Sequence, residues 1–227
     1  MQVVVVSTAG AGSAPHWSHA FAGTLADAFV ARGADVTWLA GVAAGEDVTA
    51  AAVQPQPFAR RVLPLPFVAR NHVDTVLELA LTEHLRRHPR APVVHAGLGA
   101  GGSPNVLWLC DRLGSPVFAC ARGAELACAR GDLVDRDGEA CRESDDPERC
   151  RWCCRTTWRR RPHVTELQNR TDLIVAGLVV AERVFVERPE DRPLVVGLGV
   201  PDRRVDVGMR PEHVVASVLG DAVAAGD

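Results

Sequence analysis

The 227-residue sequence contains no lysine and no tyrosine, and aromatic residues make up only 5% of it. All 25 basic residues are therefore arginines, so a single arginine is weak evidence of a binding function. The formal charge of −3 gives no net attraction to nucleic acid or to a membrane surface. No apolar run approaches the roughly 20 residues that a membrane-spanning helix needs. Because the N-terminus also lacks a basic region and a cleavage site, we expect a cytoplasmic protein without a signal peptide.

The pattern of apolar residues predicts an α/β fold. Hydrophobic residues make up 47% and charged residues 23% of the chain, as in an ordinary globular protein. Strand patterns alternate with helix patterns, which favours a single Rossmann-like, doubly wound and mostly parallel sheet with helices on both faces. The expected strands cover residues 3–6, 34–39, 61–65, 92–96, 116–120, 171–176 and 194–198, and the expected helices cover residues 16–32, 70–88, 104–113, 179–186 and 211–225.

One segment interrupts this alternation. Residues 126–161 are charged, rich in cysteine and poor in apolar periodicity. We therefore expect one domain over residues 1–200, in which residues 126–161 form an inserted hairpin and residues 41–57 an irregular loop. Residues 201–227 would then hold a polar linker and a C-terminal helix that packs back on the domain.

Cysteine is absent before residue 110, and six of the seven cysteines lie between residues 120 and 154. An odd number of cysteines in a chain without a signal peptide argues against a disulfide framework. The spacing Cys128-x12-Cys141-x8-Cys150-x2-Cys153 predicts four thiolate ligands, a set that suits a structural Zn2+ ion. A segment with so little apolar surface to bury would obtain its folding free energy from the metal.

Alternatives to this zinc site stay open. An iron–sulfur cluster also binds four thiolates. Cys154 is an alternative to Cys153 as the fourth ligand, although the C-x-x-C spacing favours Cys153, and His163 is a weaker substitute. Without a metal, Cys110, Cys120 or Cys154 would be the candidate nucleophile of a thiol enzyme. A cysteine at a strand end is, however, more often a small buried apolar residue.

Glycine-rich loops follow two of the expected strands, at the edge of the sheet where such folds bind ligands. Gly10 and Gly12 precede the first helix, whose N-terminus offers N–H groups to a phosphate. The loop at 97–102 has the letters of a dinucleotide-binding motif but lacks its acidic residue, and a tight turn explains it more simply. His16 and His95 lie at the same edge. We therefore expect a substrate-binding cleft lined by Gly10, Gly12, His16, His95 and Gly99.

Arginines and tryptophans flank the cysteine set. Such a cluster can bind nucleic acid or an acidic ligand through phosphate contacts and base stacking. In a chain whose basic residues are all arginine, a solvated flank of a metal module is the simpler explanation, so we expect no nucleic-acid partner. The cluster consists of Arg149, Arg151, Trp152, Arg155, Trp158, Arg159, Arg160 and Arg161.

The order of these segments resembles that of a known family. A first strand with a glycine-rich loop is followed by a helix ending in ARGADVTWLAG and by the strand and loop VVHAGLGAGG. The cysteine segment comes next, from LGSPVFACARGAELACARGDLVDRDGEAC to CRWCC, and then the stretch that contains VVGLGV. This order resembles the N-terminal, acceptor-side domain of family 4 glycosyltransferases of the GT-B fold, in the sub-group with a cysteine-bearing hairpin. The resemblance covers about residues 1–200.

The resemblance implies a cleft for a small-molecule acceptor and a second domain, of ~150–200 residues, that binds a nucleotide-sugar donor. Only residues 201–227 follow here, so we expect a separate donor-binding glycosyltransferase half, or a second copy of this chain, to complete the enzyme. The family places a His-Asp pair where this chain has Arg122 and Gly123, with Glu125 as the acidic neighbour. The implied catalytic residues are therefore Glu125 as a base and Arg122 as a clamp for an acidic acceptor or a donor phosphate.

A function from a different class fits the same residues. Since the His-Asp pair of the family is replaced here, the chain would equally serve as a non-catalytic, zinc-stabilised scaffold or as a regulatory partner of a glycosyltransferase. A thiol enzyme is the third hypothesis, in which Arg122 would lower the thiol pKa of Cys120.

Overall fold

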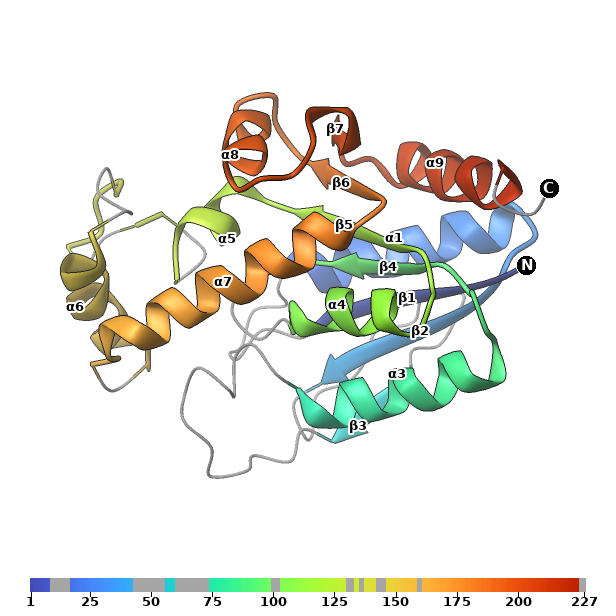
Figure 1. Ribbon diagram of the computed structural model, residues 1–227, viewed down its shortest axis with the longest axis horizontal. Helices are drawn as coiled ribbons and strands as arrows, with labels where there is room; N and C mark the ends of the chain where they lie inside the picture. The colour runs from blue at the N-terminus through green and yellow to red at the C-terminus, as the bar shows by residue number, and fades with distance from the viewer. Residues whose placement is uncertain are drawn as a thin grey trace.

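The strands of the computed structural model form one parallel sheet with helices on both faces (Figure 1). The structure describes residues 1–8, 17–42, 56–59, 74–98, 103–129, 133–134, 137–141, 146–158 and 161–224. Within these ranges the strands are β1 (Gln2–Thr8), β2 (Asp35–Val42), β3 (Gln56–Ala59), β4 (Val93–Ala96), β5 (Val117–Ala121), β6 (Arg183–Val186) and β7 (Val205–Val207). The helices are α1 (Trp17–Ala31), α3 (Thr75–Arg87), α4 (Asn105–Arg112), α5 (Gly123–Ala127), α6 (Pro147–Trp158), α7 (Val164–Val180), α8 (Asp191–Gly197) and α9 (Pro211–Ala224). The sequence-based prediction of a Rossmann-like sheet is thus confirmed.

The sheet separates two apolar cores. Alternate residues of a strand point to opposite faces, and all four valines at 3–6 of β1 are fully buried, as in a central strand covered on both sides. Val4 and Val6 pack in the core that contains side chains of α3, α4, α7 and α8, and Val3 and Val5 pack in the core of α1 and α9. In Figure 1, α3, α4 and α7 lie in front of the sheet and α1 lies behind it.

The strand order β3-β2-β1-β4-β5-β6-β7 reverses direction between β1 and β4. The chain moves outward from β1 through β2 to β3, then crosses to the other side and proceeds from β4 to β7. Loops that leave neighbouring strands on the two sides of such a reversal diverge and leave a crevice at the carboxyl edge, where Rossmann-like proteins bind ligands. The carboxyl ends of β1 and β4 flank this switch point.

The sheet continues beyond residue 200. Residues 201–210 were expected to form a polar linker, but Val205–Val207 forms the edge strand β7, which pairs in parallel with β6. The 3-10 helix at Asp202–Arg204 leads into it. Helix α9 then returns over α1 and buries Val214, Val215 and Val218 in the shared core, as its apolar stripe predicts.

The sequence predicts strands at 171–176 and 194–198 and a helix at 179–186, and these three predictions are wrong. Residues 171–176 lie inside α7, residues 183–186 form β6, and residues 194–197 belong to α8. A short apolar run suits a buried helix as well as a buried strand. For residues 171–176, close packing of α7 against α4 favours the helix. The two helices approach so closely at Gly177 that a Cβ there would lie 2.9 Å from the Pro104 carbonyl oxygen.

The other predicted strands and helices either agree with the structure or lie outside the described residues. The remaining predicted strands and helices match β1, β2, β4, β5, α1, α3, α4 and α9 to within a few residues. Strand β3 occupies the end of the segment expected to be a loop, and the strand expected at 61–65 lies outside the described residues. Among the helices described, none has both the length and the hydropathy needed to cross a bilayer.

Candidate functional site

The carboxyl edge of the sheet brings three chain segments together at the switch point. They are the start of α1 after β1, the turn after β4 and the start of α5 after β5. Four residues predicted for this cleft, Gly10, Gly12, His16 and Gly99, lie outside the described residues, so their role stays a prediction. The described part of the site consists of Trp17, Ser18, Gly97, Leu98, Arg122 and Glu125.

The side chain of Glu125 joins all three segments. It is 1% exposed. Its Oε1 accepts a hydrogen bond from the indole N–H of Trp17 at 2.8 Å. Its Oε2 accepts from the backbone N–H groups of Leu98 (3.4 Å) and Arg122 (3.3 Å). Hydrogen bonds to a charged acceptor are stronger than neutral ones, so this carboxylate fixes the relative positions of the loops that would line a ligand.

Gly97 lets the β4 turn approach α1 closely. Its φ of +85° lies in the left-handed region, and its N–H donates to the Cys120 carbonyl at 2.9 Å. A Cβ at this position would lie 2.6 Å from the Cβ of Ser18, closer than any ordinary contact. The position therefore requires glycine both for its backbone conformation and for space.

Arg122 lies on the rim of the site, where it is half-exposed. Its guanidinium stacks over Trp17, 4.5 Å from the ring centroid. It also forms a fork with Glu187, which follows β6, through contacts of 2.9 Å (Nε–Oε2) and 3.1 Å (Nη2–Oε1). An exposed pair of this kind contributes about 0–1 kcal/mol, so a ligand phosphate or carboxylate would displace Glu187 at little cost.

His95 lies at the end of β4, but its side chain is fully buried. It shares the strand face of Val93, which belongs to the core of α3 and α4. Neither ring nitrogen has a hydrogen-bond partner in the described part of the chain. Burial lowers the pKa of His95 to about 4. The imidazole is therefore neutral near pH 7, and its full burial leaves no surface for contact with a ligand.

The four cysteines of the predicted metal set come from α5, α6 and a short hairpin between them. Cys128 directly follows α5, and Cys150 and Cys153 lie on α6. Cys141 follows the bridge between Val134 and Ala140, and the Cys153 sulfur lies 3.6 Å from the Val134 carbonyl. Burial raises the pKa of the Cys150 thiol to about 11, and the neighbouring thiols of Cys128, Cys141 and Cys153 add to the shift. The fold thus brings together sulfurs that are up to 25 residues apart in the sequence.

This gathering does not by itself form a metal centre. Among the described residues, which include all four cysteines, no group of three or more His, Cys, Asp or Glu side chains is arranged to hold a metal ion. A structural zinc ion requires four ligands at about 2.0–2.3 Å in a tetrahedron. The zinc site, like the iron–sulfur alternative, therefore stays a prediction. His163 instead caps α7, where its Nδ1 accepts from the Thr165 N–H at 3.3 Å.

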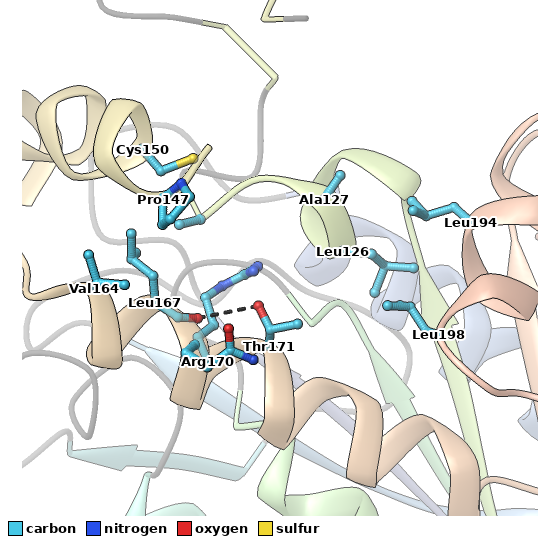
Figure 2. A pocket seen from close by; sticks show the side chains of 12 residues that line it. Leu126, Ala127, Pro147, Cys150, Val164, Leu167, Arg170, Thr171, Leu194 and Leu198 are labelled. Carbon is cyan, nitrogen blue, oxygen red and sulfur yellow. Dashed lines mark hydrogen bonds between the residues drawn. The ribbon is translucent and has the colours of Figure 1, made fainter. Parts of the chain in front are cut away.

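The thiols proposed as nucleophiles are poorly placed for that chemistry. Cys110, Cys120 and Cys154 are buried. Burial raises the thiol pKa of all three, that of Cys154 to about 12. Since the thiolate is the nucleophile, these cysteines would be largely unreactive at neutral pH. Cys150, a member of the predicted metal set, lines a pocket, and Figure 2 shows it facing Arg170 and Leu126 across that pocket.

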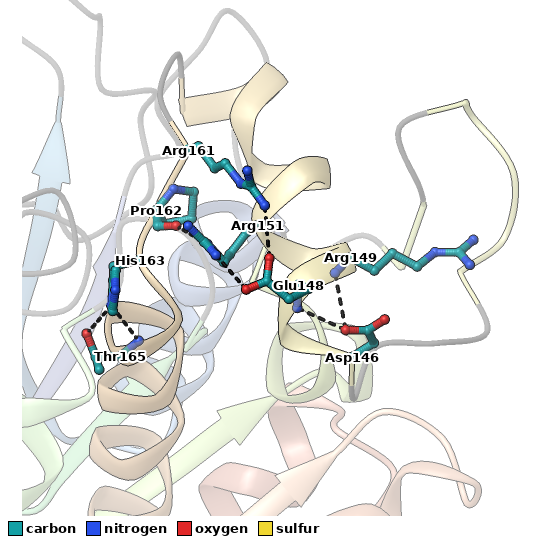
Figure 3. A network of polar contacts seen from close by, with 8 residues as sticks. All are labelled: Asp146, Glu148, Arg149, Arg151, Arg161, Pro162, His163 and Thr165. Atoms are coloured by element: carbon teal, nitrogen blue, oxygen red, sulfur yellow. Dashed lines mark hydrogen bonds and ion pairs between the residues drawn. The ribbon is translucent and has the colours of Figure 1, made fainter.

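Arginines on and just after α6 form contacts with the helix itself, and Figure 3 shows Arg151 and Arg161 around Glu148. Glu148 binds Arg151 at 2.5 Å and Arg161 at 2.9 Å. The guanidinium of Arg161 also stacks over Trp152, 4.1 Å from the ring centroid. Arg151 and Arg161 therefore already have a carboxylate or an aromatic face as partners, whereas Arg159 and Arg160 lie outside the described residues.

Several residues of the site carried no clear signal in the sequence. Trp17 stands at the first helical position after the glycine loop, which was the only available indication. Glu187, which pairs with Arg122, is one of many surface carboxylates. Arg170 lies outside the site but donates to the Glu125 backbone carbonyl, and it falls in the segment predicted to precede a strand.

The comparisons with known proteins do not show a family for this chain. No family model and no curated protein matches the sequence. Three of the solved structures that match are Anabaena Alr3699/HepE in complex with UDP and glucose (10% identity, TM-score 0.46), Phytolacca americana UGT2 with UDP-2fluoro-glucose and pterostilbene (14%, 0.48) and a UDP-glucosyltransferase from Polygonum tinctorium (14%, 0.47). Each match covers 90% of this chain but only 43%, 52% and 52% of the respective solved chain. The chain thus spans about half the length of these proteins, and at such identities and TM-scores the activity does not follow from them.

Proposed function

We propose that this chain is the acceptor-binding half of a glycosyltransferase-like enzyme whose donor-binding half lies outside these 227 residues. The observation that supports the proposal is the buried Glu125 carboxylate, which holds the segments after β1, β4 and β5 around the switch point. A sheet of this order binds ligands at that place. Loops fixed in this way provide a preformed floor for a small-molecule acceptor.

The contacts suggest a separate role for each residue. Arg122, whose one described ion-pair partner is the exposed Glu187 carboxylate, is the candidate to bind a donor phosphate or an acidic acceptor. Trp17 supports the guanidinium from one side. Both oxygens of Glu125 accept hydrogen bonds from the protein, so we assign it a positioning role. The role of Glu125 as a base stays a prediction, since a base needs an oxygen within reach of the acceptor hydroxyl.

A reconstitution experiment tests this function. The purified chain would be mixed with a candidate donor-binding domain, and release of UDP from UDP-glucose would be measured with a panel of phenolic acceptors. We expect turnover only when both halves are present. Arg122→Gln should lower that turnover roughly tenfold or more, as expected for loss of a charged contact, and Glu187→Gln, which removes only the displaceable partner, should retain it. Turnover by the chain alone would contradict the division of labour.

The same assay distinguishes an acceptor-binding half from a non-catalytic scaffold. A scaffold would activate the donor half through its surface and not through the switch-point site. Turnover that requires this chain but is unaffected by Arg122→Gln would therefore favour a non-catalytic partner.

We also propose that Cys128, Cys141, Cys150 and Cys153 bind a structural Zn2+ ion. Four neighbouring thiols are a donor set that suits zinc, and thiolate binding would stabilise a hairpin with little apolar core. Elemental analysis of the purified protein should find one zinc ion per chain. Cys141→Ser and Cys153→Ala should each lose it, whereas Cys154→Ala should retain it. Iron in place of zinc, or unchanged zinc in Cys141→Ser, would contradict the assignment.

A further inference from the structure

A pocket of about 360 Å³ lies between α5, α6, α7 and α8 (Figure 2). None of the switch-point residues described above lines it. Its walls are mostly apolar, and the lining includes Leu126, Ala129, Val164, Leu167, Leu194 and Leu198. Both the volume and the composition are those of a small-molecule site, in which an apolar wall carries a few polar groups.

One cation borders this apolar pocket. Arg170, on α7, is 3% exposed, and Figure 2 shows its side chain extending into the space between Leu167 and Leu126. One Nη2 hydrogen bond goes to the Glu125 backbone carbonyl. Its Nε–H has no hydrogen-bond partner, and no ion pair joins Arg170 to a carboxylate within the described part of the chain. The guanidinium therefore has more hydrogen-bonding capacity than its surroundings use.

Burial of a guanidinium is unfavourable because the charge loses its hydration. The Glu125 carboxylate and the thiols of Cys128, Cys150 and Cys154 lie near enough to act on the charge of Arg170, but none of them accepts a hydrogen bond from its Nε–H. A ligand carboxylate would accept this unused hydrogen bond and offset part of the cost of burial. Arginine presents a planar fork of N–H donors that matches a carboxylate, and the leucine-rich walls match an apolar body. We propose that this pocket binds a small organic acid, with its carboxylate on Arg170 and its apolar part against the leucines of α5, α7 and α8.

The competing explanation is that the Glu125 carboxylate and the nearby cysteines already balance the charge of Arg170. Cys150 lines the same pocket, and thiolates bound to a metal would carry negative charge. In that case the pocket would have no preference for an acid over a neutral molecule of the same shape. The proposal does not rest on the sugar-transfer function, since no residue of the switch-point site takes part in it.

The test compares two probes that differ only in charge. Decanoate and decanamide have the same ten-carbon chain, and only decanoate is an anion at pH 7.5. Isothermal titration calorimetry on the full chain should show one saturable decanoate site, with an affinity roughly tenfold or more above that for decanamide. Equal affinities, or no saturable site for decanoate, would overturn the proposal without any need for a variant.

Variants then locate the site. Arg170→Gln should abolish the preference for decanoate, and Arg170→Lys, which keeps the charge, should retain part of it. Leu198→Trp narrows the pocket and should weaken both probes, whereas Arg87→Gln, at an exposed arginine of α3, should change neither. Circular dichroism checks the fold of each variant. A preference that survives both Arg170→Gln and Leu198→Trp would place the binding elsewhere and refute the assignment.

Discussion

Replacing Gly97 by alanine is expected to destabilise the protein by about 3 kcal/mol or more. Two effects add: an L-residue in the left-handed region costs roughly 1–2 kcal/mol, and overpacking costs about 1–3 kcal/mol. The new Cβ would lie 2.6 Å from the Ser18 Cβ, so α1 and the β4 turn must separate. Urea unfolding followed by circular dichroism measures the loss.

Two other glycines provide matched controls for this prediction. Gly33 and Gly114 have φ of +78° and +70°, and a Cβ on either would meet nothing within 4 Å. Alanine at these positions should therefore cost only the conformational part, about 1–2 kcal/mol. If Gly97→Ala is no worse than Gly33→Ala and Gly114→Ala, the close approach to Ser18 does not matter for stability.

Replacing Glu125 by glutamine should cost about 2–4 kcal/mol, because the side chain keeps its shape but loses its charge and one acceptor oxygen. Three donors from the Trp17 indole and from the backbones of Leu98 and Arg122 converge on the carboxylate. The amide group of glutamine would leave one of them facing another N–H in a buried site. The free energy of unfolding from urea titration, at constant m-value, measures the effect.

Glu187→Gln is the control for Glu125→Gln, since it removes the exposed carboxylate that pairs with Arg122 at the rim of the site. We expect it to change the free energy of unfolding by no more than about 1 kcal/mol. Similar losses in the two variants would show that the Glu125 contacts are not the main link between the loops.

Sequence patterns located the sheet because its central strands are continuous apolar runs. The four buried valines of β1 and the strand before His95 have no competing helical pattern. The pattern failed between residues 164 and 198, where the apolar stretch of α7 suits a strand as well as a helix. Its helical state follows from burial of Leu167, Ile174 and Leu178 against other helices, which is a property of the packed structure.

The site was only partly predictable for the same reason. Glu125 and Arg122 follow a recognisable strand, and the family resemblance pointed to them. The indole that binds Glu125 comes from a residue 108 positions away, and the Leu98 N–H from 27 positions away. Such partners depend on the strand order, which one sequence does not specify. Arg170 gave no signal, because every basic residue of this chain is an arginine.

The two strands at the edges of the sheet, as far as the structure describes it, bear on how this chain would associate with a partner. β3 is four residues long and contains Pro57, which has no N–H to donate, and β7 is three residues long, with Asp206 paired to Arg183 of β6. Short edges that carry proline or charge discourage the addition of a strand from another molecule. A second copy or a donor-binding half would therefore dock through helices or loops, and the sheet itself would not extend across such a junction.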